Sequence, residues 1–478
     1  MNDKRESLGK NSVSVLAARL ASPFFSFILI VCVARILGAE ELGKYSLSLS
    51  FLLIFQLLPT LGLHHYIPRE ISRNYSIVSD YLFHGTVLFV ITSIVAIFLM
   101  NIITHFFPYS QDVKYGLMII SLALLPSALY TLYESVLIGM EKMSYLSITS
   151  FLEGIFRSLL SIAGVFMGLG FKWLVCVVLA SKIFSCFILI WILRDKFPMR
   201  FSFQKKIIYD FLNASKIFFG INLLAVLNSR IDFIILSVLT GFANLGYYAV
   251  SYRIIESLTL ISGALVTAFF PVLSRLFSEN RQNFQELSRK LIHLIIIVFF
   301  PVSACLAIFA DLIINLFFPE GYQQAVDILR IMAGLTFLAA FDQTLATIVI
   351  SSNKQNRELL ILSISCFFYI VFLLVLVPLF GLYGAATATI SAMALQTAFR
   401  FSYISLSLFQ VRLFSIAWKP LLTVLLLFVC FFLIPHNITG AITGIVLYCI
   451  TIFFLMNFLL KRLLCCRGTS LENFTHRS

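Results

Sequence analysis

The sequence has too few charged residues for a water-soluble protein. Asp, Glu, Lys and Arg together make up 12% of the 478 residues, whereas a soluble domain carries about 25%. Sixty per cent of the residues are apolar and 50 of them are Phe, so the chain cannot cover a folded core with polar surface. A water-soluble fold is therefore excluded, and the composition predicts a polytopic integral membrane protein.

Motifs for covalent chemistry are also missing. The sequence has no Gly-x4-Gly-Lys-Ser/Thr phosphate loop, no His-Glu-x-x-His pair and no Gly-x-Ser-x-Gly elbow. No Cys or His cluster has metal-ligand spacing, and the nine cysteines lie in apolar runs and the C-terminal tail, so we expect no disulfide framework. The sequence predicts a transporter rather than an enzyme, with no catalytic residue, no metal and no bound cofactor.

Long apolar runs dominate what is present. A spanning helix needs about 20 mostly apolar residues, and runs of this length recur from end to end of the chain. The sequence predicts an all-α integral membrane fold of about 14 transmembrane helices, over residues 12–36, 46–65, 81–103, 116–139, 145–168, 172–193, 214–239, 245–268, 291–317, 325–350, 359–379, 382–405, 415–434 and 438–460.

The net charge of +13 comes from cationic residues whose distribution among the loops indicates the topology of these spans. Most of the 35 Lys and Arg residues fall in alternate loops, beginning with Lys4, Arg5 and Lys10 at the N-terminus. Loops on the other side, such as Gly241–Asn244 and Phe380–Gly384, contain no charged residue. Cationic loops stay in the cytoplasm, which places both termini there. We find no clustered basic face or recognition motif for nucleic acid.

An internal repeat predicts two lobes. Residues 38–48 (Gly-Ala-Glu-Glu-Leu-Gly-Lys-Tyr-Ser-Leu-Ser) share their Gly, Leu, Gly, Tyr and final Ser with residues 241–251 (Gly-Phe-Ala-Asn-Leu-Gly-Tyr-Tyr-Ala-Val-Ser). A fainter match joins Gly168-Leu169 to Gly381-Leu382. Six spans separate the members of each pair, so the halves share one orientation. We predict an N-lobe at 1–193, an inter-lobe cytoplasmic loop at 194–213, a C-lobe at 214–405, and two further spans with a cytoplasmic tail at 406–478.

Charged side chains inside the predicted spans are the candidate functional residues, because charge is costly in lipid and usually faces a cavity or a partner. Three same-helix pairs could be purely structural: Glu153 with Arg157, Arg253 with Glu256, and Asp327 with Arg330. Lys216 and Arg400 could extend to the lipid headgroups. Cavity-lining candidates for substrate binding are Arg19, Arg157, Lys182, Arg230, Asp232 and Arg253; candidates for ion coupling are Asp232, Glu256 and Asp342.

Three segments resemble a known family of exporters. Residues 35–45 (Arg-Ile-Leu-Gly-Ala-Glu-Glu-Leu-Gly-Lys-Tyr) are similar to the Arg-x-Leu-Gly-x4-Gly-x-Tyr/Phe signature of its first hairpin. Residues 228–232 with 245–253, and residues 318–330, are similar to its later segments. The chain thus resembles Wzx-type O-antigen flippases, in the polysaccharide-exporter branch of the multidrug/oligosaccharidyl-lipid/polysaccharide superfamily.

The resemblance implies a fold of two six-helix lobes around a cavity, followed by two added helices. It implies that the cargo is an undecaprenyl-pyrophosphate-linked oligosaccharide, the O-antigen repeat unit, moved from the cytoplasmic to the outer leaflet of a bacterial inner membrane by alternating access. Beyond that cargo and the membrane lipids, a polysaccharide polymerase and a chain-length regulator are the expected partners. The drive would be a proton gradient, a sodium gradient or consumption of the flipped product.

Three other interpretations remain open. A flippase for another lipid-linked envelope precursor, such as a capsule, exopolysaccharide, teichuronic acid or peptidoglycan unit, would share this architecture. A cation-coupled drug antiporter of the same superfamily typically has 12 spans and a more acidic cavity. A polymerase or ligase of similar hydropathy usually carries a large outer loop with arginines, whereas the outer loops predicted here are short and bare.

Overall fold

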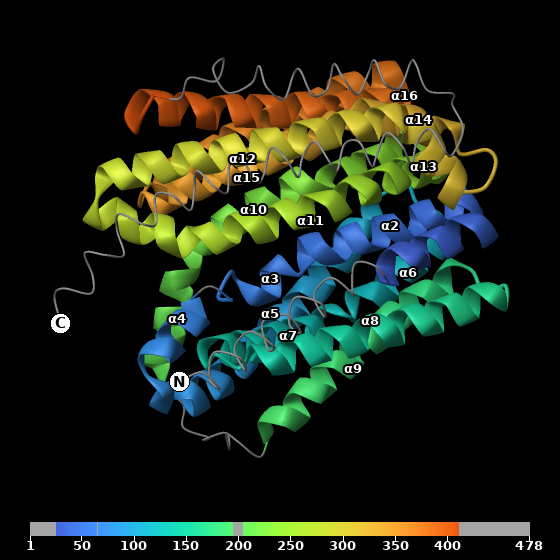
Figure 1. Ribbon diagram of the computed structural model, residues 1–478. Helices are drawn as coiled ribbons and strands as arrows, with labels where there is room; N and C mark the ends of the chain where they lie inside the picture. Colours follow the sequence, from blue (N-terminus) through green and yellow to red (C-terminus); the bar gives the residue numbers. More distant parts are fainter. Residues whose placement is uncertain (1–24, 65, 195–203, 411–478) are drawn as a thin grey trace, which may run out of the picture. The chain divides into compact units, whose positions relative to one another are not determined.

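The computed structural model describes residues 25–64, 66–194 and 204–410, and this part of the chain is helical without a strand. After an initial helix Phe25–Ile36, the labelled elements (Figure 1) are α2 Gly38–Phe55, α3 Leu57–Thr60, α4 Tyr66–Arg73, η1 Tyr75–Ile77, α5 Val78–Phe106, α6 Gln111–Ser121, α7 Leu124–Gly139, α8 Met143–Phe166, α9 Phe171–Arg194, α10 Lys205–Thr240, α11 Phe242–Glu279, α12 Arg281–Ile308, α13 Ala310–Phe317, α14 Gln323–Met332, α15 Gly334–Ser351 and α16 Gln355–Ser407.

Ten helical stretches within the described ranges are long and apolar enough to cross a membrane, which confirms the predicted fold class. The longest, α16, contains two predicted spans, 359–379 and 382–405. The spans meet at Gly381, whose φ of 57° and ψ of −128° interrupt the helix. The predicted spans 415–434 and 438–460 lie outside the described residues, as do Arg19 and residues 195–203 of the predicted inter-lobe loop.

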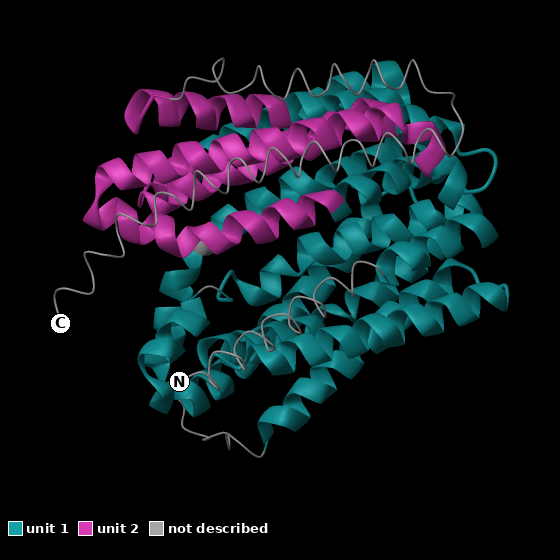
Figure 2. Cartoon of the chain, in the orientation of Figure 1, with its two compact units in different colours: residues 1–257, 314–328, 359–392 teal, residues 258–313, 329–358, 393–478 magenta. Residues whose placement is uncertain are grey.

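Packing divides the chain into two compact units (Figure 2). The first comprises residues 1–257, 314–328 and 359–392, and the second comprises residues 258–313, 329–358 and 393–478. The long helices α11 and α16 each pass from one unit to the other. This division follows packing and differs from the predicted lobe boundaries, which remain a prediction.

Each unit has its own apolar core. In the first unit, Leu63 and Ile67 pack with Phe89 of α5 and Leu132 of α7. In the second, α12 packs along α15 through side chains such as Ile295 and Leu345, among others. Many large apolar side chains elsewhere point outward, including Phe98, Phe106, Leu159, Phe166 and Phe187. Such exposure would be unfavourable in water and is favourable in lipid, so it agrees with a membrane-spanning protein.

The sequence repeat reappears in the backbone. Gly38 and Gly241 have φ angles of 83° and 88°, and Gly168 and Gly381 have φ angles of 76° and 57°. Glycine adopts these left-handed angles without the steric cost that a Cβ atom brings. Both members of each pair matched in sequence therefore have a positive φ angle.

The two copies of the repeat contact each other through glycine. A Cβ atom added to Gly43 of α2 would lie 1.9 Å from the carbonyl oxygen of Phe242, and one added to Gly246 of α11 would lie 1.9 Å from that of Ala39. Phe242 and Ala39 occupy equivalent places in the two copies, so the contact is reciprocal, as across a two-fold axis. These glycines allow the first turns of α2 and α11 to meet backbone to backbone.

We expect Gly43→Ala and Gly246→Ala each to destabilise the protein by about 2 kcal/mol, because the new methyl group meets backbone that cannot move aside without cost. The measurement is thermal unfolding of the detergent-purified full chain. Gly220→Ala in α10 is the matched control, since its new methyl group would lie 3.7 Å from a methyl group of Leu359, which is an ordinary van der Waals contact. If all three variants unfold at the same temperature, the reciprocal contact is not tight.

Candidate functional site

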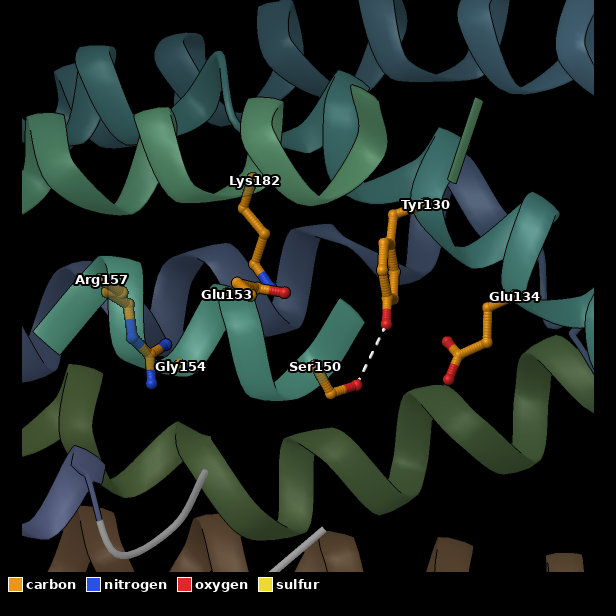
Figure 3. A pocket seen from close by; sticks show the side chains of 7 residues that line it. All are labelled: Tyr130, Glu134, Ser150, Glu153, Gly154, Arg157 and Lys182. Atoms are coloured by element: carbon orange, nitrogen blue, oxygen red, sulfur yellow. Dashed lines mark hydrogen bonds and ion pairs between the residues drawn. The ribbon is translucent and has the colours of Figure 1, made fainter. Parts of the chain in front are cut away.

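A polar cavity of about 280 Å³ lies inside the first unit, among apolar helices (Figure 3). It is lined by side chains of α7, α8 and α9, two of them cationic and two acidic: Tyr130, Glu134, Ser150, Glu153, Gly154, Arg157 and Lys182. Ionised groups are costly in lipid and mark functional sites by default, so we take this cavity as the centre of the candidate site.

Helical spacing explains how α8 supplies most of the lining. Ser150 and Gly154 lie four residues apart, as do Glu153 and Arg157, so these four residues share one face of α8. The small Gly154 keeps that face open between the longer side chains. From α7, the hydroxyl of Tyr130 lies 3.3 Å from that of Ser150. The cavity therefore offers hydroxyl groups beside charged ones.

Lys182 reaches the cavity from α9 and pairs with Glu153, with 2.6 Å between Nζ and Oε1. We expected no acidic partner for Lys182 on its own helix, and its partner comes from the neighbouring helix. The side chains of Lys182 and Glu153 are 22% and 11% exposed, so the pair is largely withdrawn from solvent. Glu153 thus compensates Lys182, whereas the sequence suggested that it could pair with Arg157.

Arg157 keeps unused hydrogen-bonding capacity. Its Nη2 donates to the hydroxyl of Ser26 at 2.5 Å, and its Nε is buried without a hydrogen-bond partner. Within the described ranges, the structure shows no carboxylate paired with Arg157. A guanidinium has five N–H donors, so Arg157 can donate to an anion that enters the cavity.

A second charged cluster lies where α10 meets α11. Glu256 accepts from Arg230 at 2.6 Å through one oxygen and from Arg253 at 2.7 Å through the other. Arg230 also lies over the rings of Phe233 and Tyr252, 5.5 Å and 5.4 Å from their centroids. Two guanidinium groups share one carboxylate, so these three residues carry an excess of one positive charge. Glu256, predicted as an ion-coupling residue, has both oxygens engaged by arginines.

Tyr45 of α2 lies near both clusters. Its buried phenol lies within range of the charges of both Arg157 and Arg253. The arginines come from opposite halves of the sequence repeat, and the structure brings both near the helix that follows the first hairpin. Tyr45 belongs to the signature segment 35–45, but sequence spacing does not show that it lies near these cations.

Asp232 lies apart from the cavity. It is fully buried, and its carboxylate accepts from the hydroxyl of Tyr248 at 2.6 Å and from the backbone N–H of Phe233 at 3.0 Å. Thr389 links Tyr248 to Tyr369, with oxygen separations of 2.9 Å and 3.0 Å. Asp232 and Arg230, two residues apart on α10, have different partners. The carboxylate is held by hydroxyl groups and does not line the cavity.

The remaining candidates belong largely to the second unit. Arg400 was expected to extend to the headgroups, but this is wrong: it is 3% exposed and pairs with Asp342 and Glu358. Glu358 was missed because it lies in a cationic loop, one residue before the predicted span 359–379. Arg330 pairs with Asp311 across two short helices. In the first unit, Asp327 accepts from Tyr383 at 3.2 Å, and the exposed Lys216 donates to Asn213 at 3.1 Å.

Comparison with known sequences identifies relatives in surface-glycan synthesis. The model of a family described as polysaccharide biosynthesis protein matches residues 32–327. A capsular polysaccharide biosynthesis protein of Staphylococcus aureus is 28% identical over 184 residues, which is 38% of this chain and 46% of that protein. A probable low-salt glycan biosynthesis flippase of Haloferax volcanii is 23% identical over 409 residues, 83% of this chain and 84% of that protein.

Solved structures show the same fold. A lipid II flippase in an inward closed conformation superposes with a TM-score of 0.74 at 16% identity, covering 94% of this chain and 99% of that one. An inward-facing multidrug transporter of the MATE family, within the MOP superfamily, gives a TM-score of 0.66 at 15% identity, covering 80% of this chain and 95% of that one. At these identities the likeness establishes the fold alone.

We predict that Lys182→Met lowers the stability by about 2 kcal/mol, because it leaves the Glu153 carboxylate largely buried without its cation. Adding Glu153→Gln should restore much of the loss, with a coupling energy of about 1–3 kcal/mol in a double-mutant cycle. The cycle is measured by thermal unfolding in detergent. Strictly additive effects of the two substitutions would show that Lys182 and Glu153 are not paired.

Proposed function

The chain belongs to the polysaccharide biosynthesis protein family, and from this premise we propose that it is a flippase for a lipid-linked oligosaccharide. Its cargo would be an undecaprenyl-pyrophosphate-linked O-antigen repeat unit, carried from the cytoplasmic to the outer leaflet of a bacterial inner membrane. The protein would act as a transporter and not as an enzyme. The observation that carries the proposal is Arg157, a guanidinium with a buried unused donor beside a polar cavity.

The hydrocarbon core of the membrane is the barrier that the proposed cargo must cross. A sugar–pyrophosphate headgroup cannot cross hydrocarbon unaided, because its charges and hydroxyl groups would lose their hydration. Arginine suits a pyrophosphate, since its planar fork of N–H groups binds phosphate oxygens bidentately. Arg157 would bind the pyrophosphate, with Arg253 contributing further positive charge near Tyr45. The hydroxyl groups of Tyr130 and Ser150 would bind sugar.

The size of the cavity limits what it holds at once. Its volume of about 280 Å³ lies just below the range for small-molecule sites, roughly 300–1,000 Å³. It would accept the pyrophosphate and the adjoining sugar, while the rest of the oligosaccharide and the lipid tail stay outside. Movement between halves would then alternate access to the two faces, and the reciprocal contact of Gly43 and Gly246 would have to separate for release at the outer leaflet.

A cation-coupled drug antiporter of the same superfamily is the second candidate, since such transporters share the fold. The balance of charge argues against it. The cluster of Arg230, Arg253 and Glu256 carries an excess positive charge, and the two cations and two acids of the cavity balance each other. Cationic drugs would be repelled from such a site, whereas an anionic headgroup is attracted.

We predict that the wild-type gene restores surface O-antigen in a strain lacking its own O-antigen flippase. Arg157→Gln should reduce the export roughly 10- to 100-fold, because losing a charge-assisted hydrogen bond of about 1.5–3 kcal/mol weakens headgroup binding by that factor. Export by Arg157→Lys should lie between that of the wild type and that of Arg157→Gln, since lysine keeps the positive charge but lacks the planar fork of N–H groups. Export is measured as surface polysaccharide at matched protein level.

Arg69→Gln is the matched control, because it makes the same change on an exposed side chain of α4, away from the cavity. Wild-type export by Arg157→Gln would contradict the role given to Arg157. A parallel assay in a strain lacking its capsule-unit flippase separates the cargo classes: restoration there alone would replace the O-antigen unit by a capsule unit.

A further inference from the structure

Two of the segments that carry the family resemblance meet through reciprocal hydrogen bonds. Arg35, near the end of the initial helix, donates through Nε to the carbonyl of Phe317 at 2.7 Å and through Nη2 to that of Leu316 at 2.9 Å. In return, Tyr322 donates through its hydroxyl to the carbonyl of Ala34 at 3.2 Å. The partners are 281 to 288 residues apart in the sequence, so one side chain of each segment binds the backbone of the other.

These residues lie where spans connect on the side predicted to face outward. The initial helix ends at Ile36, α13 ends at Phe317 and α14 begins at Gln323. The alternation of cationic loops along the chain places both connections away from the cytoplasm. The reciprocal hydrogen bonds therefore join the first and second halves of the sequence at the predicted outer side.

The end of α13 suits an arginine. The last four carbonyls of a helix have no N–H partner within it, and the helix dipole places partial negative charge there. Leu316 and Phe317 are the last two residues of α13, and the planar fork of Arg35 reaches both carbonyls. Within the described ranges no carboxylate forms an ion pair with Arg35, so the negative end of α13 is what its guanidinium contacts.

The third segment of the resemblance fixes α14 to α11. The ring of Tyr247 meets that of Tyr322 edge to face, with 5.2 Å between the centroids. The hydroxyl of Ser251 donates to the carbonyl of Ala325 at 2.7 Å. On the same helix α11, Gly246 makes the close backbone contact with α2. The two halves of the sequence are thus joined at two neighbouring places, and α11 connects them.

The contact made by Arg35 can break and re-form at low cost. Arg35 is exposed, so its N–H groups and the two carbonyls can exchange their hydrogen bonds for bonds to water. The buried clusters lack that exchange. Arg400, for example, is 3% exposed, and separating it from its carboxylates would leave charges uncompensated. The exposed contact is therefore suited to opening during transport, and the buried pairs are suited to staying intact.

We propose that Arg35 and Tyr322 form a latch that holds the outer side of the protein closed and that opens to release cargo into the outer leaflet. Opening parts the initial helix from the segment that joins α13 to α14. Arg35, the first residue of the signature segment, would thus control release, whereas the cavity residues bind cargo. The latch rests on the proposed function for the cargo that it releases, but its opening can be measured without cargo.

The test measures how fast a reporter cysteine at Ser237 is labelled, in the full chain with its nine native cysteines replaced by serine. Ser237 is 5% exposed, and its hydroxyl lies 2.8 Å from that of Tyr109 in the other half of the sequence. Separation of the halves at the outer side would expose this position to water. A membrane-impermeant maleimide is added to spheroplasts, and the labelled fraction is followed over time by mass spectrometry.

Arg35→Gln should raise the labelling rate of Ser237→Cys about 10-fold, because losing a charge-assisted hydrogen bond favours the open state by roughly that factor. Tyr322→Phe removes only a neutral hydroxyl and should raise the rate about 3-fold. Arg69→Gln and Tyr115→Phe are the matched controls. They make the same changes on exposed side chains of α4 and α6, and they should leave the rate unchanged.

A second reporter distinguishes opening of the latch from general loosening. Ser121 is fully buried and accepts from Asn101 at 2.9 Å, and both residues belong to the first half. Ser121→Cys should therefore stay unlabelled in every variant. Labelling of Ser237→Cys at the same rate with and without the two latch substitutions would overturn the latch. An equal rise at Ser121→Cys would also overturn it, because the whole fold would then have loosened.

The labelling rate is independent of any cargo, so this test is separate from that of the proposed function. Faster labelling in both latch variants, with no export of O-antigen or capsule units, would support the latch and reject the flippase. Export by a protein whose labelling rate responds to neither substitution would support the flippase and reject the latch.

Discussion

The cost of placing charge among apolar helices governs this protein. Each buried charged cluster joins helices that are separate in sequence: Lys182 to Glu153, Arg230 and Arg253 to Glu256, and Arg400 to its two carboxylates. Removing one member of such a pair would leave an uncompensated charge, which is why the pairs specify which helices lie together. The cluster of Arg230, Arg253 and Glu256 departs from neutrality by one positive charge, and this excess supports the anionic cargo that we propose.

The internal repeat supplies the frame for these charges. Gly43 and Gly246 bring the first turns of α2 and α11 into backbone contact. Gly43 faces the carbonyl of Phe242, and Gly246 faces the carbonyl of Ala39, which is the equivalent position in the other copy. This symmetry brings Arg157 from the first half and Arg253 from the second near the same phenol of Tyr45. Small residues at this contact thus determine how closely the charges of the two halves approach.

Hydropathy predicted the helices well because lipid sets a length of about 20 apolar residues for each span. The repeat was also visible, since glycines with left-handed backbone angles, such as Gly38 and Gly241, recur at matched positions. Charge pairing was not predictable in the same way. Sequence spacing shows only partners on one helix, and Lys182, Arg230 and Arg400 take theirs from other helices or from distant turns. Those partners are chosen by packing, which a single sequence does not display.

The central claim is that this chain itself moves a lipid-linked oligosaccharide across a bilayer. The most direct measurement reconstitutes the purified protein into vesicles that contain an undecaprenyl-pyrophosphate-linked repeat unit. A membrane-impermeant glycosidase then reports the fraction of sugar accessible from outside. The account predicts that wild-type protein makes the inner-leaflet sugar accessible over time, whereas vesicles without protein release only the outer half. Equal release from both kinds of vesicle would contradict it.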